Sequence, residues 1–491
     1  MRIKSGIGFI FLGLFALATV DTTAQNENDA LRYGRYYSTG TARYAAMGGA
    51  FGALGADVSS LANNPAGLGL FRKNQITLTP GIAVTSTRSI FEGQTHKDTR
   101  TTANLANLGF VFSSKLGKGR NTPYSGWQFL NVGLAYNKTS DFNKQVLVQG
   151  VNTQSSLLDV FVNNANSGNI GAFYESLAIS SELLVVDSST GKYYAFNAPW
   201  PKAGKIQRKE IEGKGSMGDV SFALGANYAN TLYIGASFNI SVLSYQETSF
   251  HSESDAGDSI PDFKNFTLKE YFRTRGSGIS GKFGIIYRPV DFLRIGLSVH
   301  TPTFFTFTDN YTNDITANFD GGGSTQALSQ LGVYKYKYSN PFRLQLSTGF
   351  ILGKYALIGL EYEYVNYRSP KYRETTGSVN YFQDVNDRIK TDFRGSHVIK
   401  AGGELKLEPF SLRAGLNYAT NPYQSAVNHS SMWGASAGAG YRNVASGFFV
   451  DLAYTLFVTK ESYWLYDPSL VPPADTRQSK NNILLTAGFN F

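Results

Sequence analysis

The side chains that most often carry catalysis or bind metals are few and scattered in this chain. It has five His and no Cys among 491 residues. The His residues lack the spacing of an HExxH motif, and neither a GxSxG nucleophile elbow nor a phosphate-binding loop occurs. The absence of Cys excludes a thiolate nucleophile, disulfides and Cys-held metal sites. We therefore expect a protein that is not an enzyme and that uses no metal or cofactor.

Charged residues recur instead at alternate positions of apolar segments. In residues 399–407, Ile399 and Leu405 alternate with Lys400 and Glu404. Because successive strand side chains point to opposite faces, each such segment has one apolar and one polar face. The residues we expect on the polar, lumen-facing side are Arg288, Arg294, His300, Arg343, Glu361, Glu363, Lys400, Glu404 and Arg413.

The charges on this polar face have a complementary order. Glu361 and Glu363 belong to the strand before the one with Lys400 and Glu404, and Arg413 follows on the next. Opposite charges on neighbouring strands would neutralise one another in a narrow lumen, where an isolated charge is costly. The alternative is a hydrated channel, in which the same charges set ion selectivity.

The period-2 pattern continues from about residue 76 to the last residue. We expect about fourteen strands, near residues 76–86, 103–114, 127–139, 216–228, 232–248, 267–287, 292–308, 334–350, 355–367, 395–407, 410–419, 433–442, 447–460 and 481–491. Tight turns alternate with long loops, and many strands reach the ~9–11 residues that cross a bilayer. This pattern distinguishes a transmembrane barrel from a soluble β-sandwich. The predicted fold is an all-β, antiparallel transmembrane barrel.

The first 75 residues have a different character. Arg2 and Lys4, the apolar stretch 7–20 and the small residues 22–24 have the layout of a secretory signal peptide over residues 1–24. Residues 25–75 are rich in Gly and Ala with little strand pattern, and we expect a compact hatch that packs on or inside the barrel. Residues 76–491 would then form the barrel.

The large insertion at 140–215 contains two apolar sets at helical spacing. Leu157 and Phe161 belong to the first set, and Phe173 and Leu177 to the second. One interpretation is an exposed apolar groove that captures a ligand. The other is a lid whose two helical faces bury each other.

The distribution of charged residues argues against nucleic acid as a partner, and three tyrosines have a spacing that allows two interpretations. The formal charge is +9, but basic residues are interleaved with acidic ones, so the clustered footprint of a nucleic-acid binder is missing. Tyr334, Tyr336 and Tyr338 have the spacing of an aromatic girdle at the lipid headgroups, or equally of cross-strand packing.

A set of short motifs resembles the FadL/TodX family of outer-membrane transporters. The hatch segment contains Gly48-Gly49-Ala50-Phe51, Asp57 and Asn63-Asn64-Pro65-Ala66-Gly67-Leu68, similar to the hatch of that family. The pairs 283–289 with 293–298, and 397–404 with 412–418, resemble two of its hairpins. Val299-His300-Thr301-Pro302 departs from the family pattern, which puts a ligand role for that segment in doubt.

The resemblance implies uptake of hydrophobic small molecules such as long-chain fatty acids, with lateral release through the barrel wall. It also implies gating by the hatch at Asp57, Asn64, Pro65 and Ala66. We expect a monomer in the outer membrane of a Gram-negative bacterium, in contact with lipopolysaccharide and inserted by the barrel-assembly machinery. Three alternatives remain open: a carrier for secreted proteins, a haem receptor, and a general porin.

Overall fold

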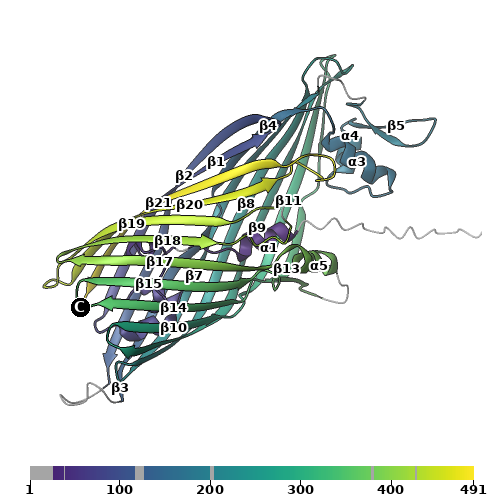
Figure 1. Ribbon diagram of the computed structural model, residues 1–491. Coiled ribbons are helices and arrows are strands. Elements are labelled where there is room, and N and C mark those ends of the chain that lie inside the picture. Colours follow the sequence, from purple (N-terminus) through teal and green to yellow (C-terminus); the bar gives the residue numbers. More distant parts are fainter. Residues whose placement is uncertain (1–25, 38, 117–125, 199–203, 377–380, 426–427) are drawn as a thin grey trace, which may run out of the picture.

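Fourteen antiparallel strands close into one barrel (Figure 1), which confirms the predicted fold class. The computed structural model describes residues 26–37, 39–116, 126–198, 204–376, 381–425 and 428–491, so the expected signal peptide lies outside the described residues. The barrel closes where β1 (Gln75–Phe91) pairs along its length with β21 (Ala474–Asn490). Closure leaves no unpaired sheet edge at this seam.

The wall follows the order of the sequence. Its remaining strands are β2 (Gln94–Lys115), β3 (Trp127–Asp141), β7 (Lys205–Tyr228), β8 (Leu232–Asp255), β9 (Phe263–Val290), β10 (Leu293–His300) continued by β11 (Phe304–Phe319), β13 (Gly332–Ser339) continued by β14 (Arg343–Leu352), β15 (Ala356–Asn366) continued by β16 (Lys371–Glu374), β17 (Gly395–Leu407), β18 (Phe410–Ala419), β19 (Met432–Arg442) and β20 (Phe448–Tyr463). Pro302, Pro341 and Pro370 mark the three interruptions, since Pro cannot donate to a ladder.

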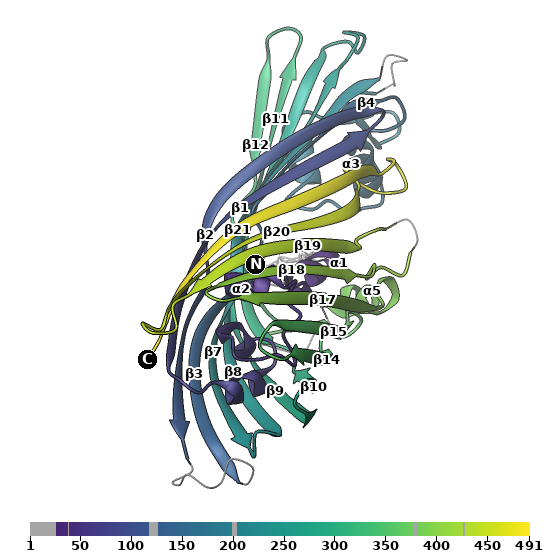
Figure 2. The same cartoon turned by 60° about the vertical axis from the view of Figure 1, so that its left-hand side comes forward.

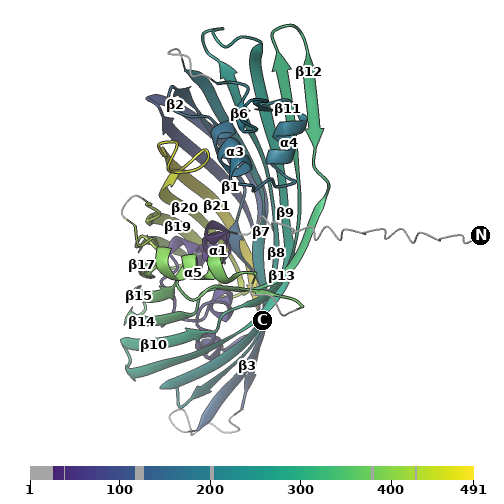
Figure 3. The ribbon, with the colours of Figure 1, turned by 90° about the vertical axis from the view of Figure 1, so that its right-hand side faces the viewer.

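One side of the wall is much taller than the other (Figures 1 and 3). β7, β8 and β9 extend over 24, 24 and 28 residues, and β1 and β2 meet at a two-residue tip. Glu92 and Gly93 at that tip both have positive φ, as a tight hairpin turn requires. Part of the expected loop 140–215 is therefore strand, namely β4 (Lys144–Asn152) and the beginning of β7.

The remaining elements decorate the long-loop end. α3 (Leu157–Asn166), α4 (Glu175–Ser180), β5 (Leu184–Val186) and β6 (Tyr193–Ala195) lie against the tall wall, β12 (Ser324–Leu328) forms a hairpin with β11, and α5 (Gln383–Asp392) precedes β17 (Figure 3). Among the described residues, no helix has the length and apolar character to cross a bilayer.

The outer face carries a belt of exposed apolar side chains. Leu78, Ile82, Leu224, Phe283 and Leu485 are among those 45% or more exposed. Strand alternation places these side chains outward and their polar neighbours inward. Such a belt is what lipid chains solvate in a membrane barrel.

The N-terminal segment fills the barrel from within (Figure 2). It consists of α1 (Glu27–Gly34), α2 (Ala42–Ala46), η1 (Val58–Leu61) and η2 (Pro65–Leu70), and we call residues 26–74 the hatch. α2, η1 and η2 lie toward the short-turn end, whereas α1 lies toward the long-loop end beside α5. The hatch therefore runs along the lumen before β1 begins.

Candidate functional site in the barrel lumen

The hatch residues singled out by sequence cap its two short helices. Asp57 precedes η1 and accepts hydrogen bonds from Ser59 N and Thr41 Oγ1, both at 2.9 Å. Asn64 precedes η2, where Pro65 takes the first helical position and Ala66 N donates to Asn64 Oδ1. Both arrangements are ordinary N-caps.

Asn64 also connects two parts of the hatch to each other and to the wall. Its Nδ2 donates to the carbonyl of Gly52 at 2.7 Å, across the hatch, and lies 3.5 Å from the carbonyls of Ile285 and Leu297 on the wall. Ala66 is fully buried. The motif therefore fixes the shape of the hatch and its seat on β9 and β10.

A ring of glycines surrounds the hatch at this level. A Cβ at any of these positions would overlap hatch atoms, which include backbone at six positions and are side chains alone at the other five. The ring comprises eleven residues on consecutive wall strands: Gly109, Gly133, Gly225, Gly235, Gly284, Gly296, Gly349, Gly359, Gly402, Gly415 and Gly438. Many of them face one another directly across the ladders, as Gly225 and Gly235 do. The wall can thus touch the hatch main chain, which leaves little room for a solute to pass between them.

The predicted charged residues meet just above this ring. Lys400 Nζ lies 2.8 Å from Glu361 Oε1 and 3.1 Å from Glu363 Oε2, and Arg343 Nη1 lies 2.9 Å from Glu363 Oε1. Glu361 Oε2 also accepts the N–H of Gly52 at 2.9 Å. The structure thus brings together four of the predicted residues and joins them to the hatch.

A second charged group lies beside it. Arg413 Nε lies 2.7 Å from Glu404 Oε2, and its Nη1 lies 2.6 Å from Asp451 Oδ1. Arg43 of the hatch contacts Glu404 with Nε at 2.7 Å and Nη2 at 3.1 Å. Arg43 and Asp451 were not expected from sequence, because neither belongs to the strand pairs used for that prediction.

The other predicted lumen residues are placed separately. His300 Nε2 lies 2.6 Å from the carbonyl oxygen of Asn63, and Arg294 Nη1 donates to the carbonyl of Leu54 at 2.7 Å. Both contact the hatch. Arg288 instead pairs with Asp291 in the turn before β10, at the rim of the barrel.

A cavity of about 90 Å³ lies between the hatch and the wall, below α1 and beside the charged group of Glu363. Tyr36, Asn63, Lys138, Arg343 and Lys400 are among its lining residues. Burial raises the pKa of Tyr36 to about 12, so its hydroxyl stays protonated and accepts from Asn340 Nδ2 at 2.7 Å. The wall of this cavity is polar, and its Lys and Arg groups already have carboxylate partners.

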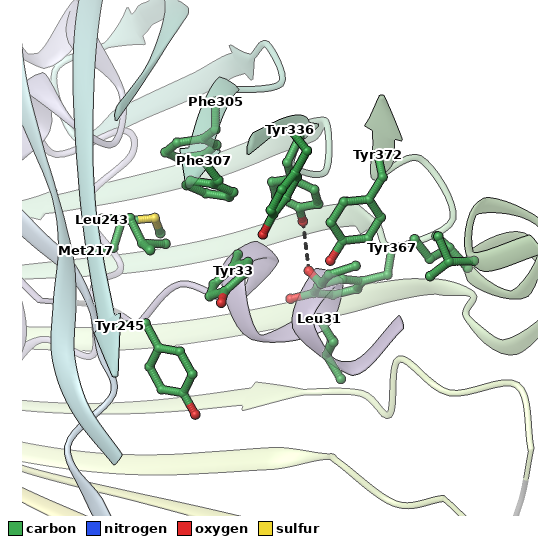
Figure 4. Close-up of a cluster of buried hydrophobic side chains, with 14 of the residues drawn as sticks. Leu31, Tyr33, Met217, Leu243, Tyr245, Phe305, Phe307, Tyr336, Tyr367 and Tyr372 are labelled. Atoms are coloured by element: carbon green, nitrogen blue, oxygen red, sulfur yellow. Dashed lines mark hydrogen bonds between the residues drawn. The ribbon is translucent and has the colours of Figure 1, made fainter. Parts of the chain in front are cut away.

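Above this cavity the lumen is filled by an aromatic cluster around α1 (Figure 4). Tyr33 packs at 5.3 Å from Phe307 and 6.2 Å from Tyr245 and Tyr338, measured between ring centroids. Leu31 lies in the same cluster, and Tyr338 OH donates to the carbonyl of Ala30 at 2.8 Å. This apolar part of the lumen is therefore occupied by the chain itself.

The girdle interpretation of three tyrosines is wrong. Tyr336 and Tyr338 are 0% and 1% exposed in this cluster, and Tyr334 packs against it. The exposed side chains of β13 are Val333, Lys335 and Lys337. The alternation was correct, but the apolar side of this strand faces the lumen.

Next to α1 is a vestibule of about 280 Å³ toward the long-loop end. Its walls include Asp29 and Arg32 of α1, Glu270 of β9, Phe173 before α4, and Tyr311 of β11. Phe173 lies with its ring 4.7 Å from that of Tyr311 and is partly exposed. This aromatic pair forms the apolar part of an otherwise polar entrance.

The other three candidate capture residues are buried. Leu157, Phe161 and Leu177 are 8%, 3% and 5% exposed and pack with Phe266 and Ile315 of the tall wall. They are therefore not exposed as a groove in this conformation. The cause is the unexpected length of β9 and β11, whose inner face covers the apolar faces of α3 and α4.

One seam of the wall lacks ladder hydrogen bonds over its upper part. β2 pairs with β3 only from Asn107 opposite Asn137 downward, whereas β2 continues to Gln94 beside β1. The hatch covers the free edge of β3: Tyr37 N donates to the Thr139 carbonyl at 3.0 Å, and Ser140 Oγ donates to the Arg35 carbonyl at 2.5 Å. A small cavity of about 20 Å³ lies here, lined by Tyr37, Ala106 and Ser140 among others.

A closed barrel of fourteen strands with an internal N-terminal hatch is the FadL/TodX-type fold, and this chain has that fold. Solved structures agree. A Pseudomonas aeruginosa FadL homologue matches with a TM-score of 0.57 and 13% identity over 93% of this chain and 100% of that one. The P. putida toluene transporter TodX matches with a TM-score of 0.52 and 12% identity over 93% and 99%. No family model matches the sequence, and no curated protein does.

Proposed function

We propose that the protein is an outer-membrane transporter of hydrophobic small molecules, such as long-chain fatty acids, in a Gram-negative bacterium. The observation that carries this proposal is the combination of a hatch packed tightly against the lower wall and a seam above that level that lacks ladder hydrogen bonds. The close fit between the glycine ring and the hatch supports a hatch that blocks the short-turn end of the barrel, which would face the periplasm. A solute that enters from the long-loop end must then leave through the wall.

The proposed route has three parts. The vestibule beside Phe173 receives the ligand, the aromatic cluster holds its apolar part, and the β2/β3 seam releases it. The seam opens next to Thr79 of β1, beside the apolar belt that includes Leu78 and Ile82. Lateral release would thus deliver an apolar molecule into hydrocarbon and not into water.

The hatch has two gating positions along this route. α1 fills the aromatic cluster with Leu31 and Tyr33, so a ligand has to displace it or take the place of these side chains. Arg35, Tyr37 and Thr39 then cover the seam. Movement of α1 together with these three residues would empty the cluster and expose the seam.

Mass spectrometry of the purified barrel tests the proposal. We expect an acyl lipid or another apolar small molecule to remain bound after extraction in mild detergent, and deletion of the gene to reduce uptake of that molecule. A secreted polypeptide retained in place of a small molecule would argue for a carrier role and against transport.

A further inference from the structure

A row of four cationic side chains crosses the outside of the barrel. Arg88 of β1 faces Lys97 of β2 on one side and Arg477 of β21 on the other, and Arg477 faces Lys460 of β20. All four side chains are exposed. The strands that carry them lie side by side (Figure 2).

Like charges in direct cross-strand register destabilise a sheet. Here three consecutive pairs have this arrangement, and within the described residues none of the four side chains forms an ion pair with a carboxylate. Asp98 is next to Lys97 but lies on the other face, opposite the buried Thr87. Asp475 is exposed on the same face, two residues above Arg477, but no ion pair joins it to the row. Within the described part of the chain the row therefore consists of four cations, none of which is paired with a carboxylate.

The height of the row indicates where such a counterpart would be. About 12 positions separate Ile76, at the lower end of the apolar belt, from Arg88. At ~3.3 Å per residue and a tilt of ~45°, this is a rise of about 28 Å. The apolar band of such barrels is ~25 Å tall, so the row lies just above it, at the level of the outer headgroups.

The chemistry around the row fits a phosphate. Directly below it, Ser86 Oγ and Thr99 Oγ1 form an exposed pair at 2.9 Å, and Ser479 faces Ser86 from β21. Hydroxyl donors next to Arg and Lys are typical of phosphate sites. Apolar side chains begin two residues further down at Val84 and Ile82, where acyl chains would lie.

A second group of cations supports the assignment of this level. Arg275, Lys335, Lys337 and Arg373 are exposed on the other side of the barrel, with Lys337 directly opposite Arg373. Arg275 is again about 12 positions above an exposed residue at the lower end of the belt, Tyr287.

From this arrangement we infer that the row Lys97–Arg88–Arg477–Lys460 binds the phosphate groups of an outer-leaflet lipid, namely the lipid A part of lipopolysaccharide. This rests on the proposed placement in the outer membrane. The bound phosphates would neutralise the row where β1 pairs with β21, and so stabilise the pairing that closes the barrel.

Binding of lipid A to the purified barrel in detergent tests the inference. The probes are bis-phosphorylated lipid A, dephosphorylated lipid A and inorganic phosphate. The variant is Arg88→Gln/Arg477→Gln, and the charge-matched control is Lys73→Gln/Lys354→Gln, which removes two exposed cations near the short-turn end. We expect the wild type and the control to bind bis-phosphorylated lipid A at least about tenfold more tightly than the variant.

The melting temperature gives a second measurement, in which the substitutions should have opposite effects without and with lipid. Without lipid, the variant should melt at a higher temperature than the wild type, because it lacks the repulsion. With bis-phosphorylated lipid A, the wild type should gain more than the variant. A variant that merely misfolds would melt at a lower temperature than the wild type under both conditions. In that case lipid A binding by a second variant, Lys97→Gln/Lys460→Gln, tests the inference. We expect its affinity for bis-phosphorylated lipid A to fall by a similar factor.

Equal binding by the wild type and both row variants would overturn the inference, as would equal binding of dephosphorylated lipid. Saturation by inorganic phosphate at the same concentration as lipid A would show a simple anion site and not a lipid site. Normal uptake of the apolar ligand with no lipid A binding would refute the lipid A site and leave the transport proposal intact. Lipid A binding without uptake of any apolar ligand would refute the transport proposal and leave the lipid A site intact.

Discussion

Lys400 and Glu361 form a buried ion pair, 2.8 Å from Nζ to Oε1, that joins the barrel wall to the hatch. The second oxygen of the same carboxylate accepts the backbone N–H of Gly52. Glu361 therefore links two parts of the chain that are about 300 residues apart. Its contacts lead to the first prediction.

Replacement of Glu361 by Gln should loosen the hatch. It leaves Lys400 with a single carboxylate, Glu363, and breaking a buried pair typically costs about 3–5 kcal/mol. We expect a lower free energy of unfolding in denaturant titrations and faster entry of small polar solutes into liposomes that carry the variant. Glu408→Gln, an exposed residue in a turn, is the control. Unchanged permeability with the barrel intact would contradict the sealing role of this contact.

Gly402→Ala should displace the hatch, because the new Cβ would overlap the carbonyl oxygen of Met47. The neighbouring Gly403 offers a matched control, since a Cβ there meets nothing closer than 3.8 Å. We expect increased conductance in planar bilayers for Gly402→Ala and wild-type conductance for Gly403→Ala. The same conductance for both variants would show that the ring does not seal the lumen.

A disulfide between Tyr37→Cys and Thr139→Cys should close the seam. Tyr37 N hydrogen-bonds the Thr139 carbonyl, so the two residues are neighbours, and the chain has no other Cys to interfere. Uptake of a fluorescent fatty acid should fall when the pair is oxidised and recover after reduction. Each single Cys variant is the control. Full uptake through a demonstrably cross-linked barrel would exclude this seam as the exit.

Tyr33→Ala should make the aromatic cluster available to ligand. The substitution removes a fully buried ring, which typically costs about 3–5 kcal/mol in a core, and leaves a cavity. An apolar ligand that fills the cavity would recover part of this loss. We expect tighter binding of an apolar fluorescent probe than in the wild type, with Tyr355→Ala, at an exposed turn, as the control. Weaker probe binding by Tyr33→Ala would mean that the ring itself contacts the ligand.

Phe173→Ala should reduce capture at the vestibule. Among the capture candidates, Phe173 lines the vestibule, and its ring packs on Tyr311. We expect a higher ligand concentration at half-maximal uptake and an unchanged maximal rate, because α3 and α4 keep their buried contacts. Ile170→Ala, nearby and exposed, is the control. An equal effect of both substitutions would argue against a specific role of this ring.

Alternation predicted the strands well, since a strand with one lipid face shows it in every second residue. It also brought Glu361, Glu363, Lys400, Glu404 and Arg413 together, because neighbouring strands in sequence are neighbours in the wall. Where both faces of a strand carry large side chains, alternation does not tell which face points to the lumen. In β13 the Lys residues point outward and Tyr336 and Tyr338 inward, which agrees with the packing alternative and not with the girdle.

Features that depend on contacts between distant segments could not be predicted from local pattern. α1 has few apolar residues, and nothing in its own sequence places Tyr33 among rings from β8, β11 and β13. The burial of α3 and α4 likewise depends on the length of β9 and β11. The glycine ring was visible only as an excess of Gly on lumen-facing positions, because its fit depends on the path of the hatch.

The glycine ring also has a consequence for how the chain can evolve. Eleven positions spread over more than 300 residues are each restricted to hydrogen as a side chain by a single segment of the hatch. Where the overlap is with hatch backbone, as at Gly235, Gly359, Gly402 and Gly415, a substitution cannot be compensated by its strand neighbours, only by a shift of the hatch against all the other strands. Saturation mutagenesis should therefore show these scattered positions as one intolerant group, with the same sensitivity as hatch residues 46–69.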